Sequence, residues 1–265
     1  MSATPAPETE PGPLEPPLVL PARSNPAGAG MRWIASGWKL FTRAPLMWII
    51  SIVLLFLAAI AMNLVPFLGS IAFQLLQGVI AAGFMVACHS LTQGGDFELE
   101  HLLAGFRTRF KDLLLLGVIF VVAGLLIVLV FALFVGVSVI TTIMTGSGEG
   151  ALSTILASSL SLLLGMLVAA ALTVPLLAAY WFAPALIVLN GMKPVAAMKA
   201  SFHGCFRNFM PFLVYSIVMF VLAILAAIPV GLGFLVWIPL AIASTYTAYR
   251  GIFTDEEADA PLVTV

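Results

Sequence analysis

The feature that most constrains this chain is a series of long apolar segments without charged residues. Residues 113–141 and 151–189, for example, contain no Asp, Glu, Lys or Arg. An α-helix needs about 20 apolar residues to cross the roughly 30 Å of hydrocarbon in a bilayer. Water-soluble domains carry roughly 25% charged residues, whereas this chain carries 9% and is 62% hydrophobic. Such a chain would expose large apolar patches in water, so the sequence predicts an all-α, polytopic helical membrane bundle.

Six segments are predicted to cross the bilayer: residues 45–64, 71–91, 113–141, 151–189, 210–228 and 233–249. The third segment is longer than a crossing requires, so it should tilt or protrude. The fourth could be divided at Pro175, but the second piece would be too short to cross, and one long helix kinked near Pro175 is preferred. The last two segments are short and joined by an apolar turn, which leaves a re-entrant hairpin open as an alternative.

The basic residues predict the orientation. All 11 Lys and Arg residues fall before the first segment, between the second and third, between the fourth and fifth, or after the sixth. The three opposite loops contain only one charged residue, Glu149. Because an excess of Lys and Arg marks cytoplasmic loops, both termini are predicted to be cytoplasmic and the number of crossings even.

The two ends of the chain differ in composition from the apolar part. Residues 1–30 are rich in Pro, Ala and Glu and hold few large apolar residues, which predicts a disordered cytoplasmic tail. They lack the charged start, short apolar run and cleavage site of a signal peptide. Residues 254–265 are predicted to form a shorter, acidic cytoplasmic tail. The membrane domain is therefore predicted to span residues 31–253.

A threefold pattern divides this domain into units at about residues 31–94, 95–190 and 191–253. In each, an amphipathic interfacial helix and a basic residue precede two spans. The second unit shows the apolar face most clearly, at Leu99, Leu102, Leu103, Phe106 and Phe110. Units that each cross twice enter with the same orientation, which predicts parallel repeats about an axis along the membrane normal. Chance similarity among amphipathic helices is the alternative.

The repeated positions pair an aromatic residue with a basic one. Aromatic rings anchor at the level of the lipid headgroups, and a cation beside them can reach lipid phosphates. Generic anchoring without lipid selectivity is the alternative. The candidate lipid-headgroup contacts are Trp38 with Arg43, Phe106 with Lys111, and Phe202 with Arg207.

The segments offer little chemistry. No ionisable residue lies deep in any predicted span, although such residues are the usual markers of ion paths and catalysis. Gln74 and Gln77 share one face of the second span and are candidate intramembrane polar contacts, either bonded across helices or lining a pore. His89 follows Cys88 directly, and side chains adjacent in sequence do not face each other on a helix.

Known motifs are also missing from the sequence. It contains no Walker loop, HExxH or G-x-S-x-G, and His101 and His203 lack partners at metal-ligand spacing. We therefore expect no catalytic, cofactor-binding or metal site and no enzymatic activity. The formal net charge of −1 gives no reason to expect a nucleic-acid partner, which calls for a strong basic excess.

Three short motifs carry a family resemblance: residues 37–41 (GWKLF), residues 103–106 (LAGF) and residues 183–191 (APALIVLNG). Over roughly residues 31–253 the chain resembles an uncharacterised family of proteobacterial six-span inner-membrane proteins. The resemblance implies a bacterial inner-membrane location. More distantly, the end of the fourth span and residues 198–201 (MKAS) resemble the membrane domain of glycerophosphoryl diester phosphodiesterases. Those relatives carry a separate soluble catalytic domain for which this chain has no room, so no phosphodiesterase activity is carried over.

Two functions are therefore weighed. The first is a structural or lipid-interacting envelope component whose partners are membrane lipids, with a second copy or another membrane protein as a further partner. The second is a transporter or channel for an uncharged or lipidic substrate. A continuous polar cavity lined by Gln74, Gln77 and the serines of the fourth span would favour the transporter, and a dry, packed centre would favour the first function.

Overall fold

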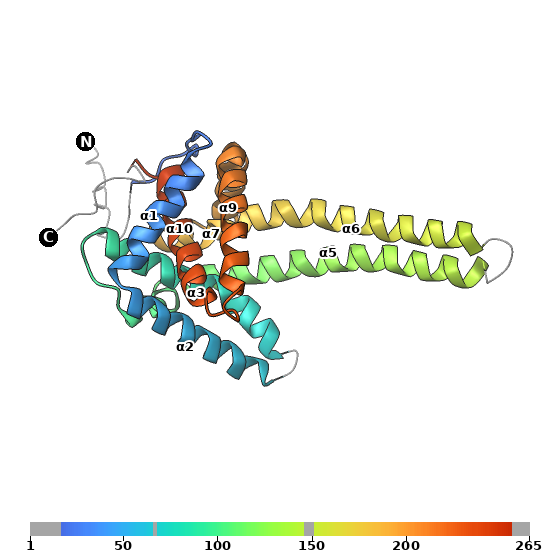
Figure 1. Ribbon diagram of the computed structural model, residues 1–265, viewed down its shortest axis with the longest axis horizontal. Helices are drawn as coiled ribbons and strands as arrows, with labels where there is room; N and C mark the ends of the chain where they lie inside the picture. The colour runs from blue at the N-terminus through green and yellow to red at the C-terminus, as the bar shows by residue number, and fades with distance from the viewer. Residues whose placement is uncertain (1–16, 66–67, 146–150, 256–265) are drawn as a thin grey trace, which may run out of the picture.

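The computed structural model describes residues 17–65, 68–145 and 151–255, and within these ranges the chain is almost entirely helical (Figure 1). The predicted all-α class is confirmed. The helices are α1 (Ala29–Arg43), α2 (Pro45–Asn63), α3 (Leu68–Thr92), the 3₁₀-helix η1 (Leu99–Leu103), α4 (Ala104–Arg107), α5 (Phe110–Thr145), α6 (Ala151–Trp181), α7 (Ala183–Asn190), α8 (Pro194–Arg207), α9 (Phe209–Ala227) and α10 (Phe234–Phe253).

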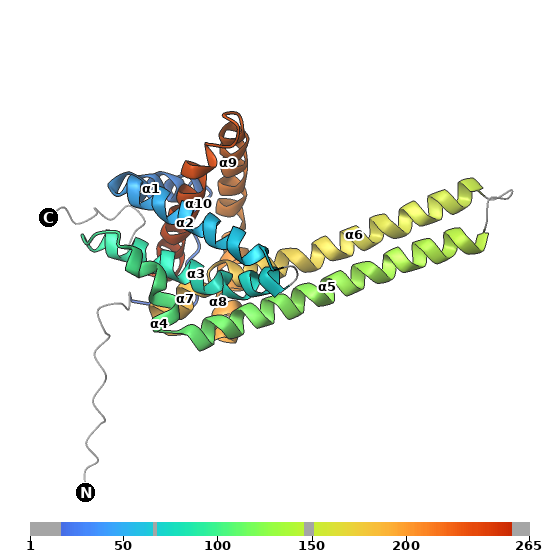
Figure 2. The ribbon, with the colours of Figure 1, turned by 90° about the horizontal axis from the view of Figure 1, so that it is seen from below.

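Three helix pairs extend in different directions from one packed region (Figures 1 and 2). The pairs are α2 with α3, α5 with α6, and α9 with α10. The packed region, named here the basal core, consists of the buried residues of α1, α7 and α8, the start of α2, and the second halves of α3 and α10. Its largest side chains include Trp33, Trp48, Phe182 and Tyr249. The Trp48 ring stacks on Phe84 at 5.8 Å between ring centroids.

The α5–α6 pair projects farthest from the basal core. Its α5 helix has 36 residues, which at 1.5 Å per residue corresponds to about 54 Å. In the most apolar stretch of α5 no residue is buried, and in that of the segment Ser158–Asn190 only 6% of the residues are buried. The side chains of this pair therefore face outward over most of its length, as expected for helices whose surroundings are hydrocarbon.

Among the described residues, five helical segments are long and apolar enough to cross a membrane: Pro45–Asn63, Leu68–Thr92, Phe110–Ile140, Ser158–Asn190 and Phe209–Ala227. They correspond to the first five predicted spans. The α10 helix has 20 residues, but its second half buries several Ser, Thr and Tyr residues and Arg250 in the basal core. These polar groups lower its mean hydropathy, so the sixth crossing stays a prediction.

Glycines allow close packing between helices of different predicted units. A methyl group on Gly37 of α1 would lie 2.7 Å from the backbone nitrogen of Ser244 in α10. A methyl group on Gly105 of α4 would lie 2.5 Å from the carbonyl oxygen of Val79 in α3. Only glycine, which lacks a Cβ, permits these approaches. The helix that opens the first unit thus packs on the last helix of the third, and α4 of the second unit packs on α3 of the first.

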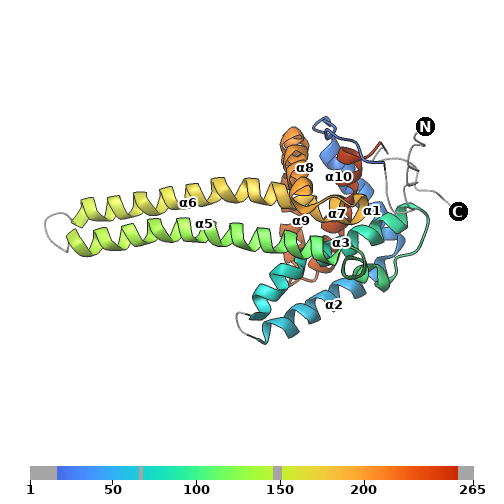
Figure 3. The same ribbon diagram turned by 180° about the vertical axis from the view of Figure 1, so that it is seen from behind.

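The third contact between predicted units is made by a serine of α8, which lies beside the C-terminal end of α6 (Figure 3). Ser201, at the position equivalent to Gly105, donates a 2.6 Å hydrogen bond to the carbonyl of Ala178 and accepts a 3.0 Å bond from the Phe182 backbone N–H. Each predicted unit therefore packs its opening helix on the preceding pair, and the three contacts close a ring.

The same contact marks a break in the fourth predicted span. The helix runs through Pro175 and ends at Trp181, so the kink expected near Pro175 is instead found at Phe182. Pro184 has no N–H and its ring clashes with the preceding turn, while Ser201 satisfies the backbone groups that the break exposes.

Two other expectations are corrected. Residues 17–28 were expected within a disordered tail, but Leu18 pairs with Thr254 in an isolated antiparallel bridge, and the Asn208 side chain bonds Asn25 and the Arg23 carbonyl. Residues 1–16 and 256–265 lie outside the described residues. The second amphipathic helix is also not continuous: it consists of η1 and α4, and Phe110 begins α5.

Candidate functional site

The first aromatic–basic pair lies on α1. The buried face of α1 packs on α10 and α9, so this helix covers protein with most of its apolar side chains. Trp38 stands on the opposite face and is 47% exposed. The Arg43 Nη1 group donates a 2.6 Å hydrogen bond to the carbonyl of Leu91, at the end of α3. A cation at a helix C-terminus is stabilising, so Arg43 fastens α1 to α3 as well as facing outward.

The second pair lies where α4 leads into α5. Phe106, 40% exposed, stacks on Phe110 at 5.8 Å, and the Lys111 side chain is exposed. Leu99 and Leu103 are also exposed, so the stretch from η1 through α4 to the start of α5 keeps an apolar outer face. Among the described residues its only ion pairs are two solvent-facing ones, and such pairs contribute little to stability.

The third pair lies on α8. Phe202 is half-buried and contacts Phe206 at 4.5 Å between ring centroids, whereas Arg207 is exposed at the end of the helix. Phe206 itself is 50% exposed. The three pairs are carried by helices that pack on three different helix pairs. The structure therefore does not bring them into one site but distributes them around the basal core.

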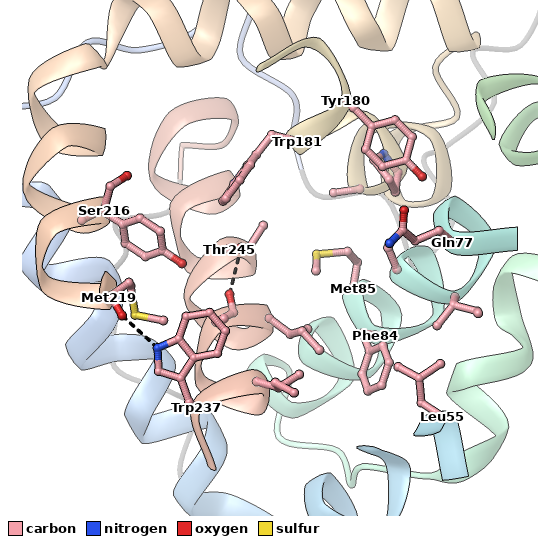
Figure 4. Close-up of a pocket in the computed structure, with 18 of the residues that line it drawn as sticks. Leu55, Gln77, Phe84, Met85, Tyr180, Trp181, Ser216, Met219, Trp237 and Thr245 are labelled. Carbon is pink, nitrogen blue, oxygen red and sulfur yellow. Dashed lines mark hydrogen bonds between the residues drawn. The ribbon is translucent and has the colours of Figure 1, made fainter. Parts of the chain in front are cut away.

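A cavity of about 650 Å³ lies between the three helix pairs (Figure 4). Its walls come from α3, α6, α7, α9 and α10, with Leu55 contributed by α2. The aromatic residues around it are Phe84, Tyr180, Trp181, Tyr215, Phe220 and Trp237. None of the described residues that line it is charged. The volume falls in the range of roughly 300–1,000 Å³ that is typical of small-molecule sites, and such sites are mostly apolar.

Three polar side chains on the cavity wall have no hydrogen-bond partner within the described part of the chain. They are the amide of Gln77 and the hydroxyls of Tyr180 and Ser216. The Tyr180 oxygen is completely buried, and a buried hydroxyl without a partner costs about 1–3 kcal/mol. By contrast, Trp237 Nε1 donates to the Met219 carbonyl at 2.9 Å, which fixes its ring against the wall.

The glutamines and serines of the sequence hypothesis separate in space. Gln77 lines the cavity, but Gln74 does not, and neither amide bonds to another described residue. Two serines of the fourth span bond across the α5–α6 pair instead: Ser158 contacts Thr142, and Ser161 donates to the Phe134 carbonyl. The polar cavity that would favour a transporter is not formed by these residues, and the centre is not tightly packed either.

A polar cluster is buried in the basal core. The Tyr246 hydroxyl lies 3.1 Å from both His89 Nδ1 and Thr92 Oγ1, so His89 has a structural hydrogen-bond partner. Cys88 and Cys205 are both free. Burial raises the pKa of the Cys205 thiol to about 12, against a smaller opposite effect of its hydrogen bond to Ser201. Within the described ranges, no three His, Cys, Asp or Glu side chains are grouped as a metal ion would require.

No sequence pattern assigned Tyr180, Trp181 and Trp237 to a common site. Tyr180 and Trp181 are neighbours on α6, but Trp237 lies more than 50 positions later on α10, and only the convergence of these helices brings the three to one cavity. Tyr215 and Ser216 gave no signal at all. A helix pattern reveals which face a residue occupies but not which distant helix faces it.

These features define a multi-pass α-helical membrane protein with an apolar central cavity. The chain is 33% identical, over 261 residues, to a protein of Burkholderia thailandensis named as a probable inner membrane protein; the match covers 89% of this chain and 94% of the relative. The chain therefore belongs to the same family of inner membrane proteins. No protein-family model matches it, and no solved structure does. The distant resemblance to the phosphodiesterase membrane domain thus stays a prediction.

Proposed function

We propose that this protein is a non-catalytic, lipid-interacting component of the bacterial inner membrane. In this proposal it crosses the membrane six times as three hairpins, each introduced by a helix at the inner interface. The basal core faces the cytoplasm together with both termini. Membrane lipids are its principal partners, and a second copy or another membrane protein is a further one.

The distribution of cations supports this orientation. Lys and Arg residues occur on α1, around α4, on α8 and at the end of α10, which are the elements around the basal core. The helix pairs point away from this region (Figure 1). The 20 residues of α10 correspond to about 30 Å of helix, which is long enough to cross, and its first half is apolar.

One observation carries the lipid-interacting function: at three places around the basal core, an exposed aromatic residue and an exposed cation lie within five positions of each other in the sequence. Trp38, Phe106 and Phe206 are 47%, 40% and 50% exposed, and Phe206 takes the place of the predicted Phe202, which is half-buried. Exposed apolar rings are unfavourable in water but favourable at the headgroup level of a bilayer. A cation beside each ring contributes about 1 kcal/mol of attraction to an anionic membrane surface.

The experiment is the retention of anionic lipid by purified protein, measured by native mass spectrometry. The test variant replaces Arg43, Lys111 and Arg207 by alanine. The matched control replaces Arg32, Lys193 and Lys199 by alanine. These residues are also exposed but are not in the candidate pairs. Their replacement likewise removes three positive charges.

We expect the test variant to lose phosphatidylglycerol about tenfold more readily than the control. Equal losses in the two variants would show general attraction without specific contacts and would overturn the assignment. Unchanged retention in the test variant would do the same. Circular dichroism of each variant checks that the helices are intact.

A further inference from the structure

The geometry points to the central cavity as a binding site for one acyl chain of a glycerophospholipid, with an ester carbonyl of that lipid at Gln77 and the headgroup outside. This inference rests on the proposed lipid-interacting function and names the ligand and its place. It concerns the cavity between the helix pairs, not the aromatic–basic pairs around the basal core.

The walls select a hydrocarbon ligand. Apart from a few polar groups, the described lining residues are aliphatic or aromatic, and none is charged. An ion or a charged headgroup inside would lose its hydration without gaining a countercharge. An acyl chain has no hydration to lose, and its contact with the rings and aliphatic side chains is favourable.

Small residues create the space. Ala81, Ala185, Ala223 and Ala241 lie on the wall, on α3, α7, α9 and α10. Protein interiors are generally close-packed, so the cavity stays open because these side chains are small. A single larger side chain at one of these positions would fill part of it.

The polar groups on the wall indicate which part of a lipid they meet. Gln77 lies close to Tyr180 on one side of the cavity (Figure 4), and its amide has no partner among the described residues, whereas the Tyr180 oxygen is enclosed by protein and out of a ligand's reach. The amide N–H of Gln77 is a donor, so it matches a carbonyl oxygen. An ester carbonyl is neutral. The carboxylate of a free fatty acid would need a cation that this wall does not provide.

The test uses full-length protein purified in a sterol-based detergent, which has no acyl chain of its own. Bound lipid is measured by native mass spectrometry after addition of palmitoyl-oleoyl phosphatidylglycerol or of oleic acid. We expect one phospholipid per chain to be retained and oleic acid to be retained more weakly. Preferential retention of oleic acid would overturn the assignment to an ester-linked lipid.

Ala241→Phe, which fills the cavity, is expected to reduce phospholipid retention by about tenfold or more. The matched control, Ala132→Phe, adds the same group on the exposed surface of α5 and should retain the lipid as the wild type does. Equal retention in both variants would overturn the proposal. Gln77→Leu keeps a side chain of similar size and removes the donor, so it is expected to weaken retention by about threefold to tenfold; no weakening would exclude the carbonyl contact.

The two proposals fail separately. The variant without Arg43, Lys111 and Arg207 keeps the cavity, so it should keep the chain-bound lipid in detergent even when its anionic-lipid preference is lost. Unchanged retention of anionic lipid in this triple variant would overturn the headgroup contacts alone. Unchanged lipid retention in Ala241→Phe would overturn the acyl-chain site alone.

Discussion

Replacing Gly37 by alanine should separate α1 from α10. The added methyl would lie 2.7 Å from the Ser244 nitrogen and 2.8 Å from its Cα, whereas non-bonded heavy atoms prefer about 3.5–4.0 Å. The helices must therefore move apart by about 0.8 Å, because backbone atoms cannot turn away as a side chain can. Overpacking of this kind costs typically about 1–3 kcal/mol.

Alanine also favours the helix, by about 0.5–1 kcal/mol relative to glycine. We therefore expect a net loss of about 0.5–2 kcal/mol in the free energy of unfolding. The matched control is Gly124→Ala in α5, where an added methyl meets nothing within 4 Å, and it should be neutral or stabilising. Reversible unfolding in mixed micelles of increasing SDS content, followed by tryptophan fluorescence, measures both. If Gly37→Ala were as stable as Gly124→Ala, the close α1–α10 contact, and with it the ring of inter-unit contacts, would be refuted.

Three further outcomes follow from particular contacts. Ser201→Ala leaves the Phe182 N–H without a partner and leaves the Ala178 carbonyl only the 3.5 Å bond from the Cys205 thiol, so the free energy of unfolding should fall by about 1–3 kcal/mol; an unchanged value in the same assay would contradict the role of this hydroxyl. Asn208→Ala should speed amide hydrogen exchange at Asn25, whose N–H donates to the Asn208 side chain at 2.8 Å; equal protection would show that the N-terminal segment is held by other contacts. The pKa of Cys205, raised by burial to about 12, keeps the thiol protonated below that pH. In a variant whose other cysteine is alanine, maleimide labelling at pH 8 should then be about a thousandfold slower than for an ordinary thiol and should accelerate on unfolding; rapid labelling of the folded protein would disprove the burial.

The apolar segments were predictable because the requirement that they meet is local. A bilayer of fixed thickness asks only for a certain length and hydropathy, so the helices from α2 to α9 that can span it begin and end within a few residues of the expected segments, with one interruption. That interruption, at Phe182, depends on Ser201, which lies 19 positions away and enters through α8. Pro184 is a local signal near Phe182, but the helix continues through Pro175 in the same segment, so a proline alone does not show where the helix breaks.

Two of the remaining differences, the ordered N-terminal segment and the cavity, also depend on residues that are distant in the sequence. The ordered N-terminal segment is held by Asn208, 183 positions from Asn25, and composition alone predicted disorder there. The second amphipathic helix ends at Arg107, next to Thr108, whose hydroxyl bonds the Ala104 carbonyl; this kind of back-bonding slightly destabilises a helix and often bends it. The cavity was missed because its residues come from three helix pairs, and a single sequence does not reveal how pairs converge.

The sidedness of three engineered cysteines tests the central claim, that three hairpins enter the membrane from the cytoplasm. In a background lacking Cys88 and Cys205, single cysteines replace Val230, which is 97% exposed between α9 and α10, Lys193 before α8, and Asp255 after α10. A membrane-impermeant maleimide added to intact spheroplasts should label only the cysteine at position 230, and label the other two after lysis. Labelling of position 255 together with position 230 before lysis would give five crossings and contradict the account.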